Sequence, residues 1–196
     1  LGQLMEERYC IAIAGTHGKT TTSAMIAWTL YKLGQDPSFI VGGVINELMT
    51  NARSGQCSSF VIEADEYDRM FLGLKPQVAV ITNIDYDHPD IYPSPEDFYQ
   101  AFQDFMYRIS SDGLLLLCGD DTGALKLKSI AQKKGIRIII YGIQNPDVDY
   151  RARNACPIPG SGYVFDVSKS SDQQRRTVQL QVPGKFNVLN ALAAAA

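Results

Sequence analysis

The sequence predicts an α/β fold, a doubly wound and mostly parallel sheet with a small antiparallel β unit near the C-terminus. Up to Asn145, short apolar or β-branched runs alternate with longer stretches of helical period, which is typical of a parallel sheet with helices on both faces. Over residues 146–183, apolar and polar residues alternate between Gly, Pro and Ser turns, which indicates antiparallel strands. We therefore expect one main sheet with an appended β unit.

The individual elements follow from the length and period of each run. Apolar runs of strand length, bounded by polar residues or glycine, predict buried strands: YCIAIAG, SFVIEAD, QVAVITNI, GLLLLCGDD and IRIIIYG. Two longer stretches predict helices, KTTTSAMIAWTLYKLG closed by Gly34 and SPEDFYQAFQDFMYRI capped by Ser94. A further helix is expected near TGALKLKSIAQKKG, and the antiparallel strands near DYRARN, GYVFDVSK and RRTVQLQVPG.

Composition indicates a globular protein without a charged tail. The chain has 196 residues, 45% of them apolar, and a formal net charge of -3. It shows neither a block of like charge typical of nucleic-acid binding nor an apolar run near the roughly 20 residues that span a bilayer, so we expect no nucleic acid and no membrane as partner. Because Cys10, Cys57, Cys118 and Cys156 are far apart, we expect reduced, mostly buried thiols in a cytoplasmic protein.

A glycine-rich loop, GTHGKTTT, joins the first predicted strand to the first predicted helix. It departs from the phosphate-binding pattern G-x-x-x-x-G-K-[ST], because Ile13 stands where that pattern has its first glycine. Gly15 and Gly18 nevertheless allow a tight turn whose N–H groups face phosphate oxygens at the positive end of the helix dipole. Lys19 would then reach the phosphates, and Thr20 would offer its hydroxyl to magnesium. The alternative is an ordinary glycine turn with a solvated lysine.

Acidic residues follow the predicted strand in SFVIEAD. In a parallel sheet, ligands bind at the carboxyl ends of the strands, so Glu63 stands where an acid would hold magnesium beside the loop. Asp65 and Glu66 could support that ligand from behind or simply be solvated. An acid at a strand end can also be a purely structural feature.

A second polar cluster follows the run VAVIT. It contains Asn83, Asp85, Asp87, His88 and Asp90. His88 could bind a second magnesium or orient a phosphate, although magnesium prefers oxygen ligands. The alternative is a charged loop in which Asp87 only holds His88. Asn83, Asp85 and Asp87 either contact a substrate or only brace His88, and the sequence leaves both possibilities open.

Four segments in this order, GTHGKTTT, EADEYD, TNIDYDH and VPGKFNVLNALAA, resemble the central ATP-binding domain of the Mur ligase family. The resemblance covers residues 1–196 and implies an ATP-dependent acid–amino-acid ligase of peptidoglycan precursor synthesis. The histidine of GTHGKTTT and the string EADE are most similar to members that add L-alanine to UDP-N-acetylmuramate. Members that attach a recycled tripeptide to the same acceptor are the alternative, and a P-loop ATPase switch is a third that Ile13 disfavours.

The resemblance also implies roles for single residues, with ATP and magnesium as ligands. The catalytic residues would be Lys19, Glu63 and His88. The magnesium ligands would be Thr20 and Glu63 for a first ion and His88 for a second. The nucleotide phosphates would lie against the loop residues Gly15, Thr16, His17, Gly18, Lys19, Thr20 and Thr21. Within that loop, His17 would shape the backbone or meet a substrate.

At the C-terminal end, the resemblance implies contact with the nucleotide base. Asn187 and Asn190 would make that contact, although Phe186 stands where the alanine-adding members usually have histidine. The implied reaction passes through an acyl phosphate. The resemblance also implies an N-terminal UDP-binding and a C-terminal amino-acid-binding domain that we expect to lie outside this chain, so we expect this fragment to bind magnesium nucleotide but not to complete ligation alone.

Overall fold

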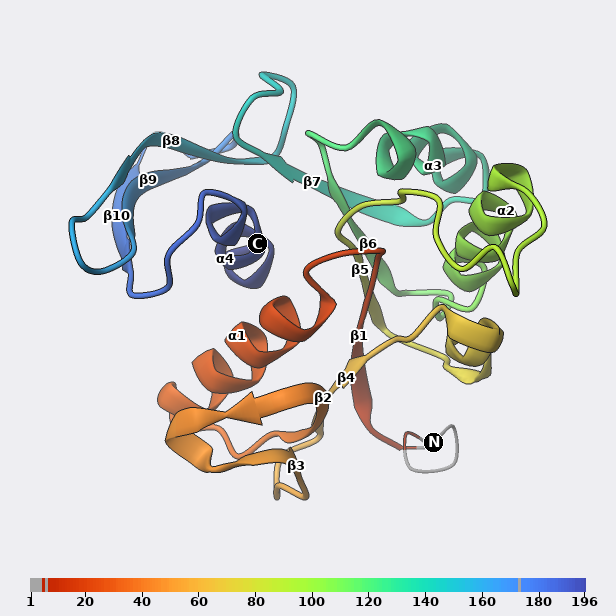
Figure 1. The fold of residues 1–196 in the computed structure, drawn as a ribbon, viewed down its shortest axis with the longest axis horizontal. Helices are drawn as coiled ribbons and strands as arrows, with labels where there is room; N and C mark the ends of the chain where they lie inside the picture. Colours follow the sequence, from red (N-terminus) through yellow and green to blue (C-terminus); the bar gives the residue numbers. More distant parts are fainter. Residues whose placement is uncertain (1–4, 6, 173) are drawn as a thin grey trace.

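A computed structural model of the chain describes residue 5, residues 7–172 and residues 174–196. It confirms the expected α/β class, because the described residues form one ten-stranded sheet in the order β10-β9-β8-β7-β6-β5-β1-β4-β2-β3 (Figure 1). The strands are β1 (Tyr9–Ala14), β2 (Ser38–Ile45), β3 (Thr50–Arg53), β4 (Ser59–Glu63), β5 (Val78–Ile81), β6 (Leu114–Cys118), β7 (Arg137–Gly142), β8 (Tyr150–Pro157), β9 (Tyr163–Lys169) and β10 (Arg175–Leu180). The helices are α1 (Lys19–Lys32), α2 (Pro95–Met106), α3 (Thr122–Lys133) and α4 (Phe186–Ala195), with short 3-10 turns η2 (Asn46–Leu48) and η3 (Tyr67–Gly73). None of these helices combines the length and the apolar character that crossing a membrane requires.

Side chains of the central strands alternate between the two faces of the sheet and form two hydrophobic cores. On β1, Ala12 and Ala14 are buried in the core that α2 and α3 cover, whereas Ile13 is buried in the core that α1 and α4 cover. On β6, Leu115 and Leu117 belong to the first of these cores. Because helices cover both faces (Figure 1), the central strands are apolar throughout, and this explains why they form continuous apolar runs in the sequence.

β1 lies at the point where the chain changes direction across the sheet. It pairs in parallel with β4 on one side and with β5 on the other. The chain runs from β1 through α1 to β2 on the β4 side, and later crosses from β4 to β5. In sheets of this kind, ligands bind in the crevice where the connections diverge, at the carboxyl ends of the strands. The loops after β1, β4 and β5 meet at that edge.

The helices begin in two different ways. Ser94 caps α2 by accepting a hydrogen bond from the N–H of Asp97 at 3.1 Å, and Asp121 caps α3 by accepting one from Ala124 at 2.6 Å. α1 instead has Gly18 at its N-cap, with φ 85° and no side-chain cap. Its first N–H groups are therefore left for another acceptor.

The expected antiparallel unit is present, and it continues the main sheet. β8 pairs in parallel with the end of β7, through Tyr141 with Tyr150 and Gly142 with Arg151. β9 then pairs antiparallel with both β8 and β10. α4 packs between this unit and α1 (Figure 1), so the antiparallel strands help to position the last helix.

Two strands, β2 and β3, were not predicted from the sequence. Gly42 and Gly43 interrupt the apolar run of β2, SFIVGGVI. β3 has no buried side chain and pairs antiparallel with β2 at the edge of the sheet. A short polar edge strand has no buried face, so it leaves no hydrophobic pattern to detect.

Thiol reactivity tests the packing of the two cores. Burial raises the pKa of Cys10 to about 12 and that of Cys118 to about 11, whereas Cys156 is exposed and Cys57 is half-buried. Because the thiolate is the reactive form, we expect a thiol reagent at mildly alkaline pH to label Cys156 quickly, and Cys10 and Cys118 only on unfolding. Mass spectrometry of peptides after brief labelling measures this. Cys156→Ser should remove the fast reaction at that site, and quick labelling of Cys10 in the folded chain would contradict the packing.

Candidate functional site

The loop between β1 and α1 and the end of β4 border an open cavity of about 310 Å³. Its lining residues are Thr16, His17, Gly18, Lys19, Thr20, Thr21 and Glu63. Of the residues predicted to bind phosphate, Gly15 alone does not line it. The structure therefore brings the predicted phosphate loop and the predicted acid together in one place.

Two glycines of the loop have no room for a side chain. Gly15 has φ 136°, and a Cβ there would lie 2.0 Å from Oγ1 of Thr82. Gly18 has φ 85°, and a Cβ there would lie 2.7 Å from Oδ1 of Asn190. Positive φ also strains any L side chain at these positions. The first glycine thus lets the loop approach the end of β5, and the second lets it approach α4.

The side-chain amide of Asn83 binds both the N–H and the carbonyl of His17. Oδ1 of Asn83 accepts a hydrogen bond from the His17 N–H at 2.8 Å, and Nδ2 donates to the His17 carbonyl at 2.9 Å. The Thr16 hydroxyl donates to the carbonyl of Asp85 and accepts from its N–H. The sequence left open whether Asn83 and Asp85 brace His88. In the structure they brace the phosphate loop instead.

We call the hydrogen bonds between Asn83 and the loop the clamp, and they determine which N–H groups are free to bind an anion. The N–H of Thr16 donates to the carbonyl of Asn83 at 3.1 Å, and the N–H of His17 donates to the Asn83 side chain. The next N–H groups, from Gly18 to Thr21, lie at the uncapped start of α1. A helix N-terminus combines unpaired donors with partial positive charge, and it therefore favours an anion in the cavity.

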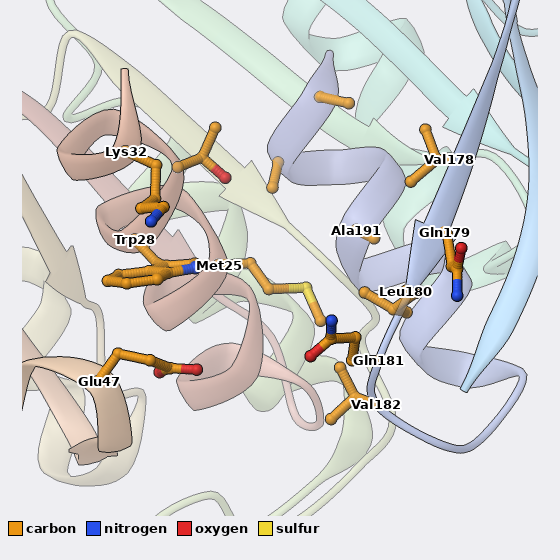
Figure 2. A pocket seen from close by; sticks show the side chains of 13 residues that line it. Met25, Trp28, Lys32, Glu47, Val178, Gln179, Leu180, Gln181, Val182 and Ala191 are labelled. Carbon is orange, nitrogen blue, oxygen red and sulfur yellow. The ribbon is translucent and has the colours of Figure 1, made fainter. Parts of the chain in front are cut away.

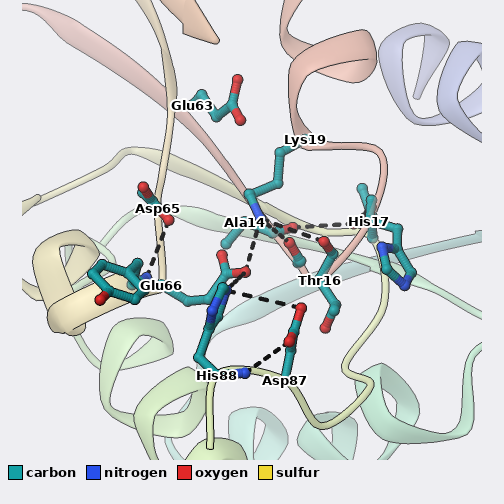
Figure 3. Close-up of polar contacts among 12 residues, drawn as sticks. Ala14, Thr16, His17, Lys19, Glu63, Asp65, Glu66, Asp87 and His88 are labelled. Carbon is teal, nitrogen blue, oxygen red and sulfur yellow. Dashed lines mark hydrogen bonds and ion pairs between the residues drawn. The ribbon is translucent and has the colours of Figure 1, made fainter. Parts of the chain in front are cut away.

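Lys19 lies beside the cavity with its ammonium group fully engaged (Figure 3). Its Nζ donates to the carbonyls of Gly15 at 2.8 Å and Thr16 at 3.4 Å. It also forms an ion pair with Oε1 of Glu66 at 2.8 Å. An ammonium has three N–H donors, and these contacts use all of them.

Thr20 and Glu63, both predicted as magnesium ligands, lie in contact. Oγ1 of Thr20 donates a hydrogen bond to Oε1 of Glu63 at 3.0 Å. The other carboxylate oxygen of Glu63 accepts from the N–H of Gly42 at 2.7 Å. Gly42 belongs to β2, so a strand that the sequence did not reveal orients this carboxylate. Hydroxyl and carboxylate oxygens are the ligands that magnesium prefers.

Glu66 has a larger role in the site than the sequence indicates. Its side chain is 1% exposed, and Oε1 pairs with Lys19. Oε2 is buried and has no hydrogen-bond partner among the described residues. The backbone carbonyl of Glu66 accepts a hydrogen bond from the hydroxyl of Tyr92, which is fully buried. The string EADE does not indicate that Glu66 is buried while its neighbour Asp65 is exposed. The contact with Tyr92 joins residues 26 positions apart, so it leaves no local signal in the sequence.

His88 faces the same buried carboxylate. Its Nε2 lies 3.7 Å from Oε1 of Glu66 and 3.9 Å from Oδ2 of Asp87. The backbone of His88 has φ 55°, and its N–H donates to Oδ1 of Asp87 at 2.7 Å. The imidazole packs edge-on against Tyr67, with ring centroids 5.2 Å apart. Asp87 therefore holds His88, as one of the alternatives from the sequence proposed, and His88 presents a ring nitrogen to Glu66.

The start of α4 borders the phosphate loop. Asn187 and Asn190 are buried, and Nδ2 of Asn190 donates to Oδ1 of Asn187 at 2.9 Å. Asn187 also donates to the carbonyl of Pro183 at 2.7 Å, while Phe186 is 68% exposed. The two asparagines fix α4 beside Gly18. Their contact with a nucleotide base stays a prediction.

A larger cavity of about 580 Å³ lies between α1, β10 and α4 (Figure 2). Its lining is mainly apolar, with Met25 and Trp28 from α1, Leu180 from β10 and Ala191 from α4. It contains none of the phosphate-loop residues. The smaller cavity, where the helix start, the lysine and the acid converge, is therefore the candidate site.

Comparison with known proteins identifies the family of this chain. The family described as Mur ligase middle domain matches residues 13–196. This chain belongs to the Mur ligase family. It is 44% identical over 194 residues to UDP-N-acetylmuramate--L-alanine ligase of Renibacterium salmoninarum, which covers 99% of this chain and 41% of that protein. It is also 44% identical over 199 residues to the ligase of the same name from Laribacter hongkongensis, which covers 100% of this chain and 41% of that protein.

Solved structures of Mur ligases share the fold. The UDP-N-acetylmuramate:L-alanyl-gamma-D-glutamyl-meso-diaminopimelate ligase of Neisseria meningitides superposes with a TM-score of 0.82 at 29% identity, over 97% of this chain and 61% of that one. The UDP-N-acetylmuramate-alanine ligase of Thermotoga maritima gives 0.79 at 26% identity, over 98% of this chain and 41% of that one. The family resemblance expected from the four motifs is thus confirmed, and this chain spans about two fifths of the length of its alanine-ligase relatives.

Removal of the Asn83 side chain tests the clamp on the phosphate loop. Asn83→Ala eliminates both side-chain hydrogen bonds to the His17 peptide, and each such bond is worth about 1 kcal/mol. We therefore expect amide hydrogen exchange at His17 to be faster by about tenfold or more, as measured by NMR. Asn51→Ala, on an exposed residue of β3, is the matched control and should leave exchange in the loop unchanged. Equal exchange at His17 in Asn83→Ala and the parent would contradict the clamp.

Proposed function

We propose that this chain is the nucleotide- and magnesium-binding part of a longer ATP-dependent ligase that adds L-alanine to UDP-N-acetylmuramate in peptidoglycan precursor synthesis. The observation that carries the proposal is the 44% identity, over nearly the whole chain, to relatives of that name. The cavity supports it, because a helix start, a lysine and a hydroxyl–carboxylate pair converge there. Since the chain covers 41% of each of these relatives, other substrate-binding groups are proposed to lie in the rest of the ligase.

The donor atoms of the site fit magnesium. Oγ1 of Thr20 and Oε1 of Glu63 are hard oxygens 3.0 Å apart, and Oε2 of Glu66 is buried without a partner in the described part of the chain. The described residues contain no group of three or more His, Cys, Asp or Glu side chains placed to hold a metal. A cation there would take further ligands from phosphates and water, as magnesium commonly does. We assign Thr20 and Glu63 to a first magnesium and His88 to a second.

The proposed reaction brings two anions together, so the main tasks of the site are charge neutralisation and alignment. A carboxylate oxygen of UDP-N-acetylmuramate forms a bond to the γ-phosphorus of ATP, and the bond to the β–γ bridging oxygen breaks, which yields an acyl phosphate and ADP. The amine of L-alanine then attacks the acyl carbon, loses a proton and displaces phosphate. Magnesium would supply positive charge to the phosphate oxygens.

The chain's own groups act mainly on the phosphates in this scheme. Lys19 and the N–H groups at the start of α1 would bind the phosphate oxygens and stabilise the charge that shifts during transfer. Asn83 would keep the loop in the shape that directs those groups. Glu63 and His88 would hold the magnesium ions in place beside the phosphates. No residue needs to form a covalent bond with substrate.

A murein peptide ligase, which attaches a recovered tripeptide to UDP-N-acetylmuramate, is the second candidate. The superposition on the Neisseria meningitides ligase, with a TM-score of 0.82 at 29% identity, favours it. Identity to the alanine ligases is higher, at 44%, so alanine addition is the better-supported activity. An ATPase switch has no comparable support, because the Mur ligase middle domain matches residues 13–196.

The added amine distinguishes the candidate activities. In the intact ligase that contains this chain, we expect ADP release from magnesium ATP and UDP-N-acetylmuramate to depend on L-alanine. A coupled assay for ADP measures this, with the tripeptide L-Ala-γ-D-Glu-diaminopimelate as the competing amine. A preference for the tripeptide would identify a recycling ligase. ADP release that needs neither the amine nor the acceptor would support the ATPase switch.

Replacement of Lys19 tests the assignment of the phosphate site. Lys19→Ala in the intact ligase removes a charge that stabilises the transferring phosphate, and we expect kcat to fall by about 10²–10³-fold. Lys126→Ala, on an exposed lysine of α3, is the matched control and should keep the parent's kcat. Thermal unfolding establishes that both variants are folded. A folded Lys19→Ala variant with the parent's kcat would be incompatible with the assignment.

A further inference from the structure

Glu66 carries a buried charge that is only partly compensated. Its side chain is 1% exposed, and its Oε1 pairs with Nζ of Lys19 at 2.8 Å. Oε2 has no hydrogen-bond partner in the part of the chain that the structure describes. Nε2 of His88 is 3.7 Å from Oε1, which is beyond hydrogen-bond distance. One lysine therefore neutralises this carboxylate, and a bound nucleotide would need the same lysine.

We infer that Glu66 is a positioning residue that couples nucleotide binding to cation binding. Without ligand, Glu66 holds Lys19. When Lys19 turns to a phosphate, the carboxylate left behind is stable only if a divalent cation takes the lysine's place beside His88. The inference rests on the proposed function, since it requires a nucleotide at Lys19. It adds a reason why nucleotide and cation depend on each other at this site.

Lys19 cannot bind a phosphate without giving up a contact that it already has. Its three donors serve the carbonyls of Gly15 and Thr16 and the carboxylate of Glu66. Lys19 and Thr16 line the cavity, whereas Glu66, the ion-pair partner of Lys19, does not (Figure 3). A phosphate in the cavity therefore competes with Glu66 for Nζ of Lys19.

The carboxylate that Lys19 leaves cannot relax into water. Glu66 is buried, and its backbone carbonyl is held by the hydroxyl of Tyr92. A buried charge without a partner is strongly destabilising, because its lost hydration is not replaced. A divalent cation held by the Glu66 carboxylate and by Nε2 of His88, which lies 3.7 Å from Oε1, would restore the charge balance with an oxygen ligand that magnesium prefers. Each ligand therefore strengthens binding of the other, and the coupling is reciprocal.

Nucleotide affinity with and without a cation measures the coupling. In the intact ligase, a fluorescent, non-hydrolysable ATP analogue is titrated in excess EDTA and in excess MgCl2. The ratio of the Kd in EDTA to the Kd in MgCl2 is then compared between variants. We expect Glu66→Gln to lower that ratio by about tenfold or more, with tighter binding in EDTA than the parent shows. Asp65→Asn removes a charge from the exposed neighbouring carboxylate and should keep the parent's ratio.

A reciprocal measurement needs no nucleotide and does not depend on the folding of Glu66→Gln. Lys19→Gln leaves Glu66 without its ion-pair partner, so we expect Mn2+ to bind the nucleotide-free variant about tenfold more tightly than the parent. Electron paramagnetic resonance of free Mn2+ measures this affinity. Lys126→Gln is the matched control and should bind Mn2+ as the parent does.

The outcomes separate this inference from the proposed function. If the parent binds the analogue but Glu66→Gln keeps the parent's ratio, or if Lys19→Gln does not bind Mn2+ more tightly, the coupling role is wrong and the proposed function stands. Equal loss of affinity in EDTA and in MgCl2 for Glu66→Gln would indicate a role in loop stability alone and would also overturn the inference. If the parent binds no nucleotide in either condition, both proposals fail.

Discussion

The attachment of the phosphate loop to the segment after β5 sets the geometry of the whole site. Asn83 takes both hydrogen-bonding groups of the His17 peptide, and Gly15 lies so close to Thr82 that no side chain fits between them. These contacts fix the backbone conformation of the loop between β1 and α1. Because α1 has no side-chain cap, that conformation leaves its first N–H groups as the donors nearest the cavity. The positions of Lys19 and Thr20 follow from where this helix begins.

The two glutamates of the site differ in burial, and this difference explains why their partners differ. Glu63 lines the cavity and contacts the Thr20 hydroxyl, so it can meet a ligand directly. Glu66 does not line the cavity; its Oε1 pairs with Lys19, and its Oε2 has no partner among the described residues. Buried polar groups in folded proteins are nearly always paired, so stability alone does not account for this oxygen. Because the same carboxylate lies near His88, whose Nε2 is 3.7 Å from Oε1, a cation is the partner that the chemistry favours.

Local features of the sequence predicted the central strands and the helices α1, α2 and α3, because covered strands form apolar runs and a cap such as Ser94 marks where a helix begins. β2 escaped prediction since Gly42 and Gly43 interrupt its pattern. In the site, Lys19 and its neighbours follow from one contiguous motif. Asn83 and Glu66 do not, since their contacts join residues 66 and 26 positions apart, and only the folded sheet brings these segments together.

The departure of the loop from the G-x-x-x-x-G-K-[ST] pattern has a physical consequence. In the longer pattern, the residues between the glycines wrap their N–H groups around phosphate. Here Thr16 and His17 alone separate Gly15 from Gly18, and their N–H groups donate to Asn83. A loop with fewer free donors neutralises less of a triphosphate's charge, so more must come from the helix start, from Lys19 and from bound cations. A site built in this way depends strongly on metal, and a carboxylate that exchanges a lysine for a cation would make that dependence part of nucleotide binding itself.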